Sequence, residues 1–170
     1  RTLGELDCLL KKEHKIIHLE IIYKFYLYDD KVGKSEIEHF IGPNRKDSLL
    51  EKLTKLKEKQ LPLLYTKECD DFLKTLKISS KQCIQNVYFK AQLFLPYINQ
   101  NIILKKLNQE CVVGYYINQL QLKQFNNSKF YIPTKKDWLI KPHTNVAWQN
   151  YIDFIPKITQ YFSEKISSLL

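Results

Sequence analysis

The chain has 170 residues, of which 44% are hydrophobic and 13% aromatic, so it can bury a core and is not expected to be disordered. Its 27 Lys and Arg outnumber its 18 Asp and Glu, and the net charge of +9 favours a polyanionic partner such as nucleic acid. No apolar run approaches the roughly 20 residues of a membrane span, and the first residues lack the apolar stretch of a signal peptide. We therefore expect one domain over residues 1–170, in the cytoplasm and without membrane contact.

The start of the chain and its cysteines add two expectations. The sequence has no Met and begins inside a predicted strand, so we expect it to be a piece of a longer polypeptide. Its four cysteines are widely scattered and form no Cys-x-x-Cys pair. We therefore expect reduced thiols and no zinc site.

A β-hairpin is predicted at the start of the chain. Residues 3–11 alternate and are rich in Leu, residues 12–15 form a polar turn, and residues 16–28 are rich in Ile, Tyr and Phe. Because side chains alternate along a strand, the second strand has two different faces. One face carries His18, Glu20, Ile22 and Lys24. The other face, which we expect to be the core, carries Leu19, Ile21, Tyr23 and Phe25.

A loop and a helix are predicted after the hairpin. Residues 29–47 contain Gly, Pro, Asn and Asp and are expected to be a loop. The pair of Ser48 and Glu51 fits a capping box that begins a helix over residues 48–61. We expect this helix to end before Pro62.

A second helix and a strand complete a crossover. The second helix is expected over residues 67–77, with Phe72, Leu73 and Leu76 turned inward. Residues 83–95 then form a strand that is closed by Pro96. The order of strand, helices and strand predicts that this strand lies parallel to one strand of the hairpin.

Four weaker elements are predicted in the rest of the chain. They are a short helix over residues 99–108, a strand over 111–117, a bent edge strand over 129–141, and an amphipathic helix over 146–169 with a kink at Pro156. The predicted fold class is therefore α/β.

Carboxylates within apolar, strand-like segments are the main functional signal of the sequence, because a buried charge is costly unless it is paired or binds a metal. Asp7 and Glu20, one from each hairpin strand, are a natural ligand pair for Mg²⁺ or Mn²⁺, and Glu5 is a further ligand candidate. Lys24 shares a face with Glu20 and is expected to orient or deprotonate a water and to contact the phosphate. Gln60 lies on the apolar stripe of the helix and needs a polar partner. We therefore predict metal-dependent phosphodiester cleavage, with four catalytic residues: Asp7, Glu20, Lys24 and Gln60.

The same residues also have a structural interpretation, which the sequence leaves open. Asp7 and Glu20 would then belong to an ion-pair network, in which Lys24 forms a salt bridge with Glu20. Gln60 would be exposed at a frayed helix end. His18 shares the acidic face, and we expect it to be a hydrogen-bonded structural residue and not a metal ligand.

Basic residues around the predicted helix are candidate nucleic-acid contacts. They are Arg45, Lys46, Lys52, Lys55 and Lys59. A solvated helix face is the alternative interpretation of this row.

The order of these residues resembles the PD-(D/E)XK nuclease superfamily, in which an aspartate is followed by an acid and a lysine on the next strand and then by a helix. The chain is most similar to one bacterial group placed in that superfamily, the domain-of-unknown-function family 1853. The matching segments run over nearly the whole chain. They are residues 1–7, 18–20 with 24–27, 42–44 with Asp47, 52–53 with 60–61, 93–94 before Pro96, and 136–139.

The resemblance implies a restriction-endonuclease-like mixed sheet flanked by helices, with an αβββαβ-type core whose first helix is missing from this chain. It implies that Asp7 is the motif aspartate, Glu20 the second acid and Gln60 the helix glutamine of some branches. The superfamily lysine usually lies two residues after the acid, where this chain has Ile22. Lys24 lies one strand period further on, about 7 Å along the strand.

The expected function is hydrolysis of phosphodiester bonds in nucleic acid, with DNA as the expected substrate and Mg²⁺ or Mn²⁺ as the cofactor. One alternative is a nuclease-like fold that binds nucleic acid without cutting it. A second is a protein-interaction module that reuses the fold, because fold alone does not determine function.

Overall fold

The predicted β-hairpin begins the fold. The computed structural model describes residues 3–134 and 136–164. β1 (Cys8–Lys12) pairs antiparallel with β2 (Lys15–Tyr28), and in the two-residue turn between them Glu13 has a φ of 55°. β2 is long because β-branched and aromatic residues, which favour strands, fill most of it. The hairpin register decides which side chains of the two strands meet.

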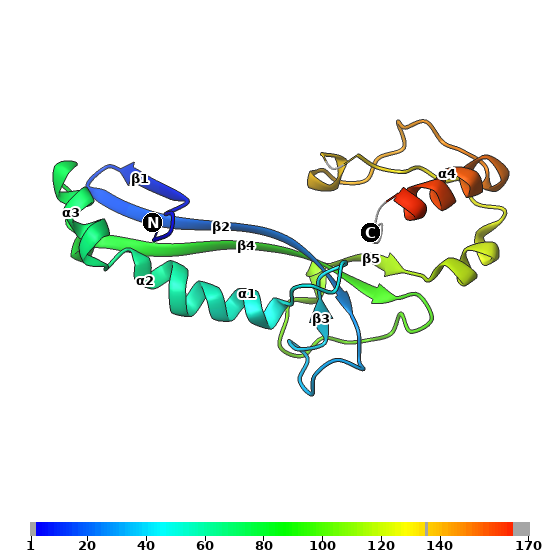
Figure 1. Cartoon of the computed structure of the whole chain (residues 1–170), viewed down its shortest axis with the longest axis horizontal. Helices are drawn as coiled ribbons and strands as arrows, with labels where there is room; N and C mark the ends of the chain where they lie inside the picture. Colours follow the sequence, from blue (N-terminus) through cyan, green and yellow to red (C-terminus); the bar gives the residue numbers. More distant parts are fainter. Residues whose placement is uncertain (1–2, 135, 165–170) are drawn as a thin grey trace. The chain divides into compact units, whose positions relative to one another are not determined.

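The sheet grows from the other edge of β2, where β4 (Cys83–Pro96) runs parallel to it. β5 (Val112–Tyr116) continues the sheet parallel to β4, and the short β3 (Phe40–Ile41) pairs antiparallel with the end of β2. The result is a five-stranded mixed sheet in the order β1-β2-β4-β5, with β3 beside β2. Figure 1 shows β2 and β4 as long neighbouring ribbons with helices along them. The mixed α/β class and the parallel crossover are therefore confirmed, and β3 lies in the segment expected to be a loop.

The helical segment of the crossover differs from its prediction. It consists of α1 (Leu49–Lys55), a π-helical turn (Leu56–Gln60) and α2 (Leu61–Leu63), which follow one another without a break. Ser48 caps its start as predicted, because the Ser48 hydroxyl accepts a hydrogen bond from the Glu51 N–H at 3.1 Å. The helix does not end before Pro62, which lies inside α2. A proline ring normally meets the carbonyl four residues earlier, and the wider π turn just before Pro62 relieves that clash.

The second predicted helix forms as α3 (Lys67–Thr75). Of the three residues that were expected to point inward, one does. Leu73 is fully buried, whereas Phe72 is 59% and Leu76 50% exposed. Successive residues of a helix point about 100° apart, so Phe72 turns away from the side that Leu73 buries. Leu76 already lies beyond the last residue of the helix.

The buried face of β2 is the opposite of the one predicted. Ile21, which was expected in the core, is 51% exposed. The residues with 0–3% exposure are His18, Glu20, Ile22 and Tyr26. The prediction was wrong because β2 carries apolar residues on both faces, so apolar content alone does not tell which face the helices cover. The polar side chains of the covered face are instead paired with polar side chains from the helices.

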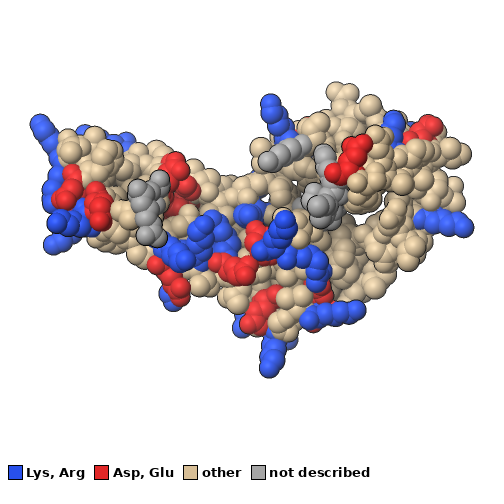
Figure 2. Space-filling model, in the orientation of Figure 1, with Lys and Arg blue, Asp and Glu red and all other residues tan. Residues whose placement is uncertain are grey.

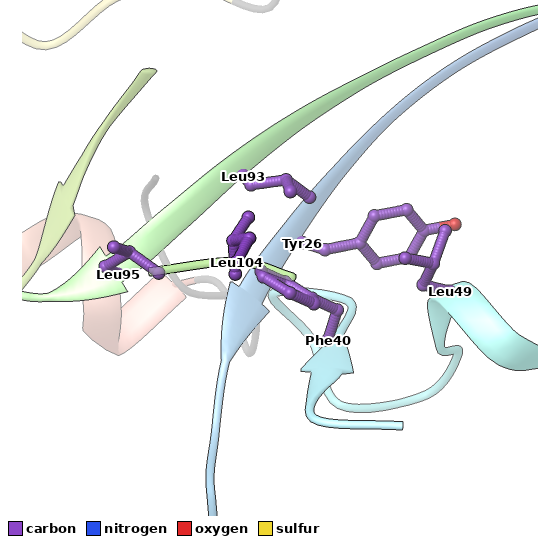
Figure 3. Packing of buried hydrophobic residues seen from close by; sticks show 6 residues of the cluster. All are labelled: Tyr26, Phe40, Leu49, Leu93, Leu95 and Leu104. Atoms are coloured by element: carbon purple, nitrogen blue, oxygen red, sulfur yellow. The ribbon is translucent and has the colours of Figure 1, made fainter. Parts of the chain in front are cut away.

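The main core lies where β2, β3 and β4 meet the start of α1. Figure 3 shows its six buried side chains, in which the Tyr26 ring extends toward Leu49. They are Tyr26, Phe40, Leu49, Leu93, Leu95 and Leu104. A second cluster joins the helices to the start of β4 through Leu64, Leu73 and Cys83.

The segment 99–108 forms no helix, contrary to the prediction. Side chains take its backbone donors instead. The N–H of Leu104 donates to Gln109 Oε1 at 2.8 Å. The Glu36 carboxylate accepts from the next three N–H groups, those of Lys105, Lys106 and Leu107, at 2.6, 2.8 and 2.9 Å. Such side-chain acceptors compete with helical hydrogen bonds, and here they hold an irregular loop that delivers Leu104 to the core.

Replacing Glu36 with Gln is expected to lower the free energy of unfolding at pH 7 by about 1 kcal/mol, after allowance for solvent screening. Burial alone would raise the pKa of Glu36, but the three N–H donors and the charge of Lys106 outweigh it, and the pKa lies below its ordinary 4.5. A lowered pKa gives stability that is present above the unfolded-state pKa and is lost as the pH falls through the folded-state value. Denaturant unfolding from pH 7 to pH 3 should therefore show the wild type and E36Q converging at acid pH. A difference that stays constant with pH contradicts this role.

The chain divides into two compact units, one ending at Tyr116 and the other beginning at Ile117. The single domain over residues 1–170 stays a prediction. Within the described ranges, no helix combines the length and apolar character that crossing a membrane requires.

The second unit is built on α4 (Tyr151–Glu164), which contains Pro156 near its start. Phe130 stacks on Phe154 of α4, with ring centroids 4.4 Å apart. The expected edge strand over 129–141 is reduced to a bridge between Phe130 and Gln149. The predicted helix over 146–169 begins later, at Tyr151, and residues 165–169 lie outside the described part.

Candidate functional site

The hairpin register brings Asp7 and Glu20 together. Cys8 pairs with Leu19, so Asp7, the residue just before β1, lies opposite Glu20. The Ile21 N–H donates to Asp7 Oδ2 at 2.8 Å, and the Asp7 N–H makes a longer contact of 3.5 Å with Glu20 Oε1. The Asp7 carboxylate is therefore bonded to the residue after Glu20, and the Glu20 carboxylate lies at the backbone N–H of Asp7. Asp7 is exposed, whereas Glu20 is fully buried.

The buried Glu20 carboxylate is held by hydrogen bonds to both of its oxygens. His18 Nε2 lies 2.7 Å from Glu20 Oε1, and Gln60 Nε2 donates to Glu20 Oε2 at 3.0 Å. In the described part of the chain, no Lys or Arg forms an ion pair with Glu20. A buried carboxylate held by neutral donors retains lone pairs and a charge that a cation would compensate. This is the chemistry of a metal ligand.

His18 supports Glu20 from within the sheet. In the register of β2 and β4, His18 lies beside Gln85, and Gln85 Nε2 donates to the Leu61 carbonyl at 2.7 Å and lies 3.1 Å from His18 Nδ1. Because Gln85 donates to Nδ1, the proton of the neutral imidazole is on Nε2 and points to Glu20. His18 is fully buried, and both of its ring nitrogens are used. This matches the expected structural role of His18.

The π-helical turn brings Gln60 to the site. Lys52 Nζ donates to Gln60 Oε1 at 3.0 Å, while the other end of the same amide donates to Glu20. Residues eight apart on a regular α-helix point about 80° away from each other, and the wider π turn between Lys52 and Gln60 takes up this angle. Gln60 thus bridges a cation and an anion, and its expected exposure at a frayed end is not what the structure shows.

Lys52 is therefore a member of the site and not of an outer basic row. Its side chain is half-buried, and burial lowers its pKa below the ordinary 10.5. The charges of Lys55 and Lys24 lower the pKa further, while those of Asp7 and Glu20 act in the opposite direction. Lys52 therefore lies in the electrostatic field of both acids.

Lys24 is held elsewhere, and its expected salt bridge with Glu20 is not formed. Its ammonium forms an ion pair with Asp47 Oδ2 at 2.9 Å, and the two side chains are 41% and 39% exposed. The backbone of Gly42 packs against the Asp47 carboxylate so closely that a Cβ at position 42 would collide with Oδ1. Gly42 thus packs against the Asp47 carboxylate, which pairs with Lys24 at the edge of the site.

The remaining predicted residues do not join the acid pair. Glu5 is exposed, and among the described residues no group of three or more His, Cys, Asp or Glu side chains is placed to bind a metal. Arg45 pairs with Asp29 at 2.8 Å, and Lys46, Lys55 and Lys59 are exposed. Figure 2 shows basic and acidic side chains interleaved over the region of α1.

An open groove adjoins the exposed acid. It has a volume of about 390 Å³ and lies between residues 3–9 and the segment from Leu63 to Phe72. Asp7 lines it, while Glu20 does not. Asp7 therefore lies between the open groove and the buried carboxylate of Glu20.

The comparisons with known proteins give one match. The family model described as "Domain of unknown function (DUF1853)" matches residues 1–169. The chain belongs to this family. No curated protein and no solved structure matches the chain significantly. Family membership names no reaction, so the site itself has to support any function.

Sequence reasoning missed the roles of Gln85 and Asp47, and it named Lys52 as a nucleic-acid contact without its link to Gln60. The signal for Gln85 was present, because it is a polar residue in a strand that the crossover places beside β2. Lys52 gave no such signal, because on a regular helix it belongs to the same stripe as Lys55 and Lys59. The π turn that rotates Gln60 toward Lys52 has no motif of its own in the sequence.

Proposed function

We propose that this protein is a divalent-metal-dependent nuclease that hydrolyses phosphodiester bonds in DNA. The observation that carries the proposal is the acid pair, in which the buried Glu20 carboxylate lies at the backbone N–H of the exposed Asp7 and no Lys or Arg of the described residues forms an ion pair with Glu20. The chain's charge of +9 suits an acidic polymer as substrate.

The donors fit Mg²⁺ or Mn²⁺. Mg²⁺ in nucleic-acid enzymes is typically held by one or two carboxylates, and waters and substrate phosphate oxygens complete its coordination. Among the described residues, Asp7 Oδ2 accepts from the Ile21 N–H while Oδ1 has no donor, and Glu20 Oε2 accepts from Gln60 alone. A bound ion would neutralise charge at phosphorus and make a water more acidic.

The roles of the protein groups follow from their contacts. Asp7 and Glu20 would hold the ion, while Gln60 and His18 fix the Glu20 carboxylate in one orientation and the backbone N–H of Ile21 does the same for Asp7. In the reaction a water oxygen attacks phosphorus and the bond from phosphorus to one sugar oxygen breaks. The products are a phosphomonoester and a free hydroxyl, and the water supplies the proton of that hydroxyl.

The fold supports the same proposal. A mixed sheet with flanking helices, acids on neighbouring strands and a glutamine from the following helix agree with the resemblance to the PD-(D/E)XK superfamily. We therefore propose a restriction-endonuclease-like core for the unit that ends at Tyr116.

The proposal is tested by comparing Asp7→Asn with Glu5→Gln. Asn keeps an oxygen that can accept from the Ile21 N–H but removes the charge, so D7N is expected to fold normally and to lose Mg²⁺-dependent DNA cleavage by at least about 100-fold. Glu5→Gln removes a nearby exposed charge and is expected to keep cleavage within about threefold of the wild type.

Two outcomes would point away from a nuclease. DNA binding that weakens steeply with salt, together with no cleavage under any divalent ion, would indicate a binding protein that uses the same fold. No DNA affinity at physiological salt would indicate an interaction module. Cleavage that D7N retains in full contradicts the proposed site.

A further inference from the structure

We propose that Lys52, from α1, and not Lys24, from β2, is the cation that contacts the scissile phosphate at this site. The inference rests on the proposed nuclease function and assigns the residue that receives the substrate. It also places the substrate phosphate between the acid pair and the helix.

The first argument is the connection of Lys52 to the acid. Lys52 Nζ donates to Gln60 Oε1 at 3.0 Å, and Gln60 Nε2 donates to Glu20 Oε2 at 3.0 Å. An amide that uses its oxygen toward a cation and its nitrogen toward an anion has one orientation only. Gln60 therefore fixes the Lys52 ammonium at a set distance from the Glu20 carboxylate.

The second argument is the free hydrogen-bonding capacity of Lys52. An ammonium has three donors, and Gln60 is the one acceptor that Lys52 has within the described ranges. Two donors remain on a side chain that is already half-buried and held by Gln60. Because less rotamer freedom is left to lose, binding of a phosphate oxygen there costs less entropy than binding by a free surface lysine.

The third argument is the local charge. Lys52 forms no ion pair with an acid among the described residues, although the charges of Asp7 and Glu20 act on it. A phosphate that approaches the acid pair would therefore meet an ammonium that no carboxylate neutralises directly. This unpaired charge attracts the phosphodiester.

Lys24 does not meet these conditions. Its ammonium forms the ion pair with Asp47, which the close packing against Gly42 keeps in place. Contact with the substrate would first require that ion pair to break.

The test uses Lys52→Gln, with Lys24→Gln and Lys55→Gln as matched variants in the full chain. At saturating DNA and Mg²⁺, K52Q is expected to lower kcat at least about 100-fold, a larger loss than its loss of DNA affinity, and K52R is expected to recover part of the loss. K24Q and K55Q are expected to keep kcat within about threefold. A melting temperature close to that of the wild type shows that K52Q is folded.

Binding gives a second measurement that does not need cleavage. The affinity for a fluorescent DNA duplex falls with salt, and the loss of one phosphate contact lowers the slope of log K against log salt by about 0.9. K52Q is expected to show this decrease and K24Q is not. If the wild type cuts DNA and K52Q cuts equally well, the Lys52 inference fails while the nuclease proposal stands. If the wild type does not cut DNA, the nuclease proposal fails. If the slope of log K against log salt is the same in K52Q and the wild type, the phosphate contact of Lys52 is also overturned.

Discussion

Glu20→Gln is expected to abolish Mg²⁺-dependent DNA cleavage, with a loss of at least about 100-fold, while the protein remains folded. The substitution keeps the shape of a fully buried side chain and removes its charge. Removal of a buried carboxylate removes its desolvation cost, but the new amide nitrogen faces another donor, so we expect the free energy of unfolding to fall by about 1–3 kcal/mol. Cleavage and thermal unfolding, measured on the same preparation, separate the two effects.

The hydrogen-bond network explains why the effect is large. His18 donates to Oε1 of residue 20, so the amide nitrogen of Gln at this position would face Gln60 Nε2, another donor. A flip of Gln60 would then bring its nitrogen against the Lys52 ammonium. The variant therefore loses the acid and the orientation of Lys52 together. Glu51→Gln, an exposed acid on α1, is the matched control. Cleavage by E20Q at more than one third of the control rate would show that Glu20 is structural.

Tyr26→Ala is expected to have the largest effect on stability, a loss of about 3–5 kcal/mol, because a fully buried aromatic ring leaves a cavity when it is truncated. The ring lies in the cluster that joins β2, β3 and β4 to the start of α1, beside Leu49 (Figure 3). Urea unfolding monitored by circular dichroism measures the loss. A loss of less than 1 kcal/mol would contradict the packing described for this cluster.

Tyr26→Phe separates the ring from its hydroxyl. In the described structure the Tyr26 hydroxyl is buried without a hydrogen-bond partner. Burial, followed by the charges of Asp47 and Glu51, raises the pKa of this hydroxyl far above its ordinary 10.0, so it remains neutral at physiological pH. Removal of an unpaired buried hydroxyl relieves its desolvation cost. Y26F is therefore expected to be as stable as the wild type or more stable, and a loss above 1 kcal/mol would reveal a partner for the hydroxyl.

Strand positions were predictable because their signals are local. The Ile-, Tyr- and Phe-rich segments became β2 and β4, and the order of strand, helices and strand gave their parallel pairing. The helix start at Ser48 was predictable for the same reason, since its cap involves residues three apart. The absence of a helix over 99–108 was not predictable, because the Glu36 carboxylate that accepts from its N–H groups lies about 70 residues away in the sequence.

The buried face of β2 was beyond the reach of pattern reasoning. Strand periodicity separates two faces but does not tell which face the helices cover when both are partly apolar. The covered face holds Glu20 and His18 because polar groups from other elements, Gln60 and Gln85, satisfy them. Those partners lie 40 and 67 residues away from the groups they satisfy.

The acids of the site could be predicted from the sequence, whereas the position of its lysine could not. Asp7, Glu20 and Gln60 were identified as a group from the sequence, and the structure brings these three together. Lys24 was preferred because it shares a strand face with Glu20. A neighbour that the strand pattern did not reveal, Asp47, holds Lys24 instead, and a π turn that the helix pattern did not reveal aligns Lys52 with Gln60.

Direct measurement of Mn²⁺ binding by electron paramagnetic resonance tests the central claim, that Asp7 and Glu20 together hold a divalent ion. We predict saturable binding at this site in the wild type and in Glu5→Gln, and at least about tenfold weaker binding in D7N and in E20Q. Because D7N is not expected to cleave DNA, its Mn²⁺ affinity can also be measured with a short DNA duplex present. We predict that the duplex does not restore the wild-type Mn²⁺ affinity. Equal Mn²⁺ binding by the wild type, D7N and E20Q would contradict the account, because the acid pair would then hold no metal.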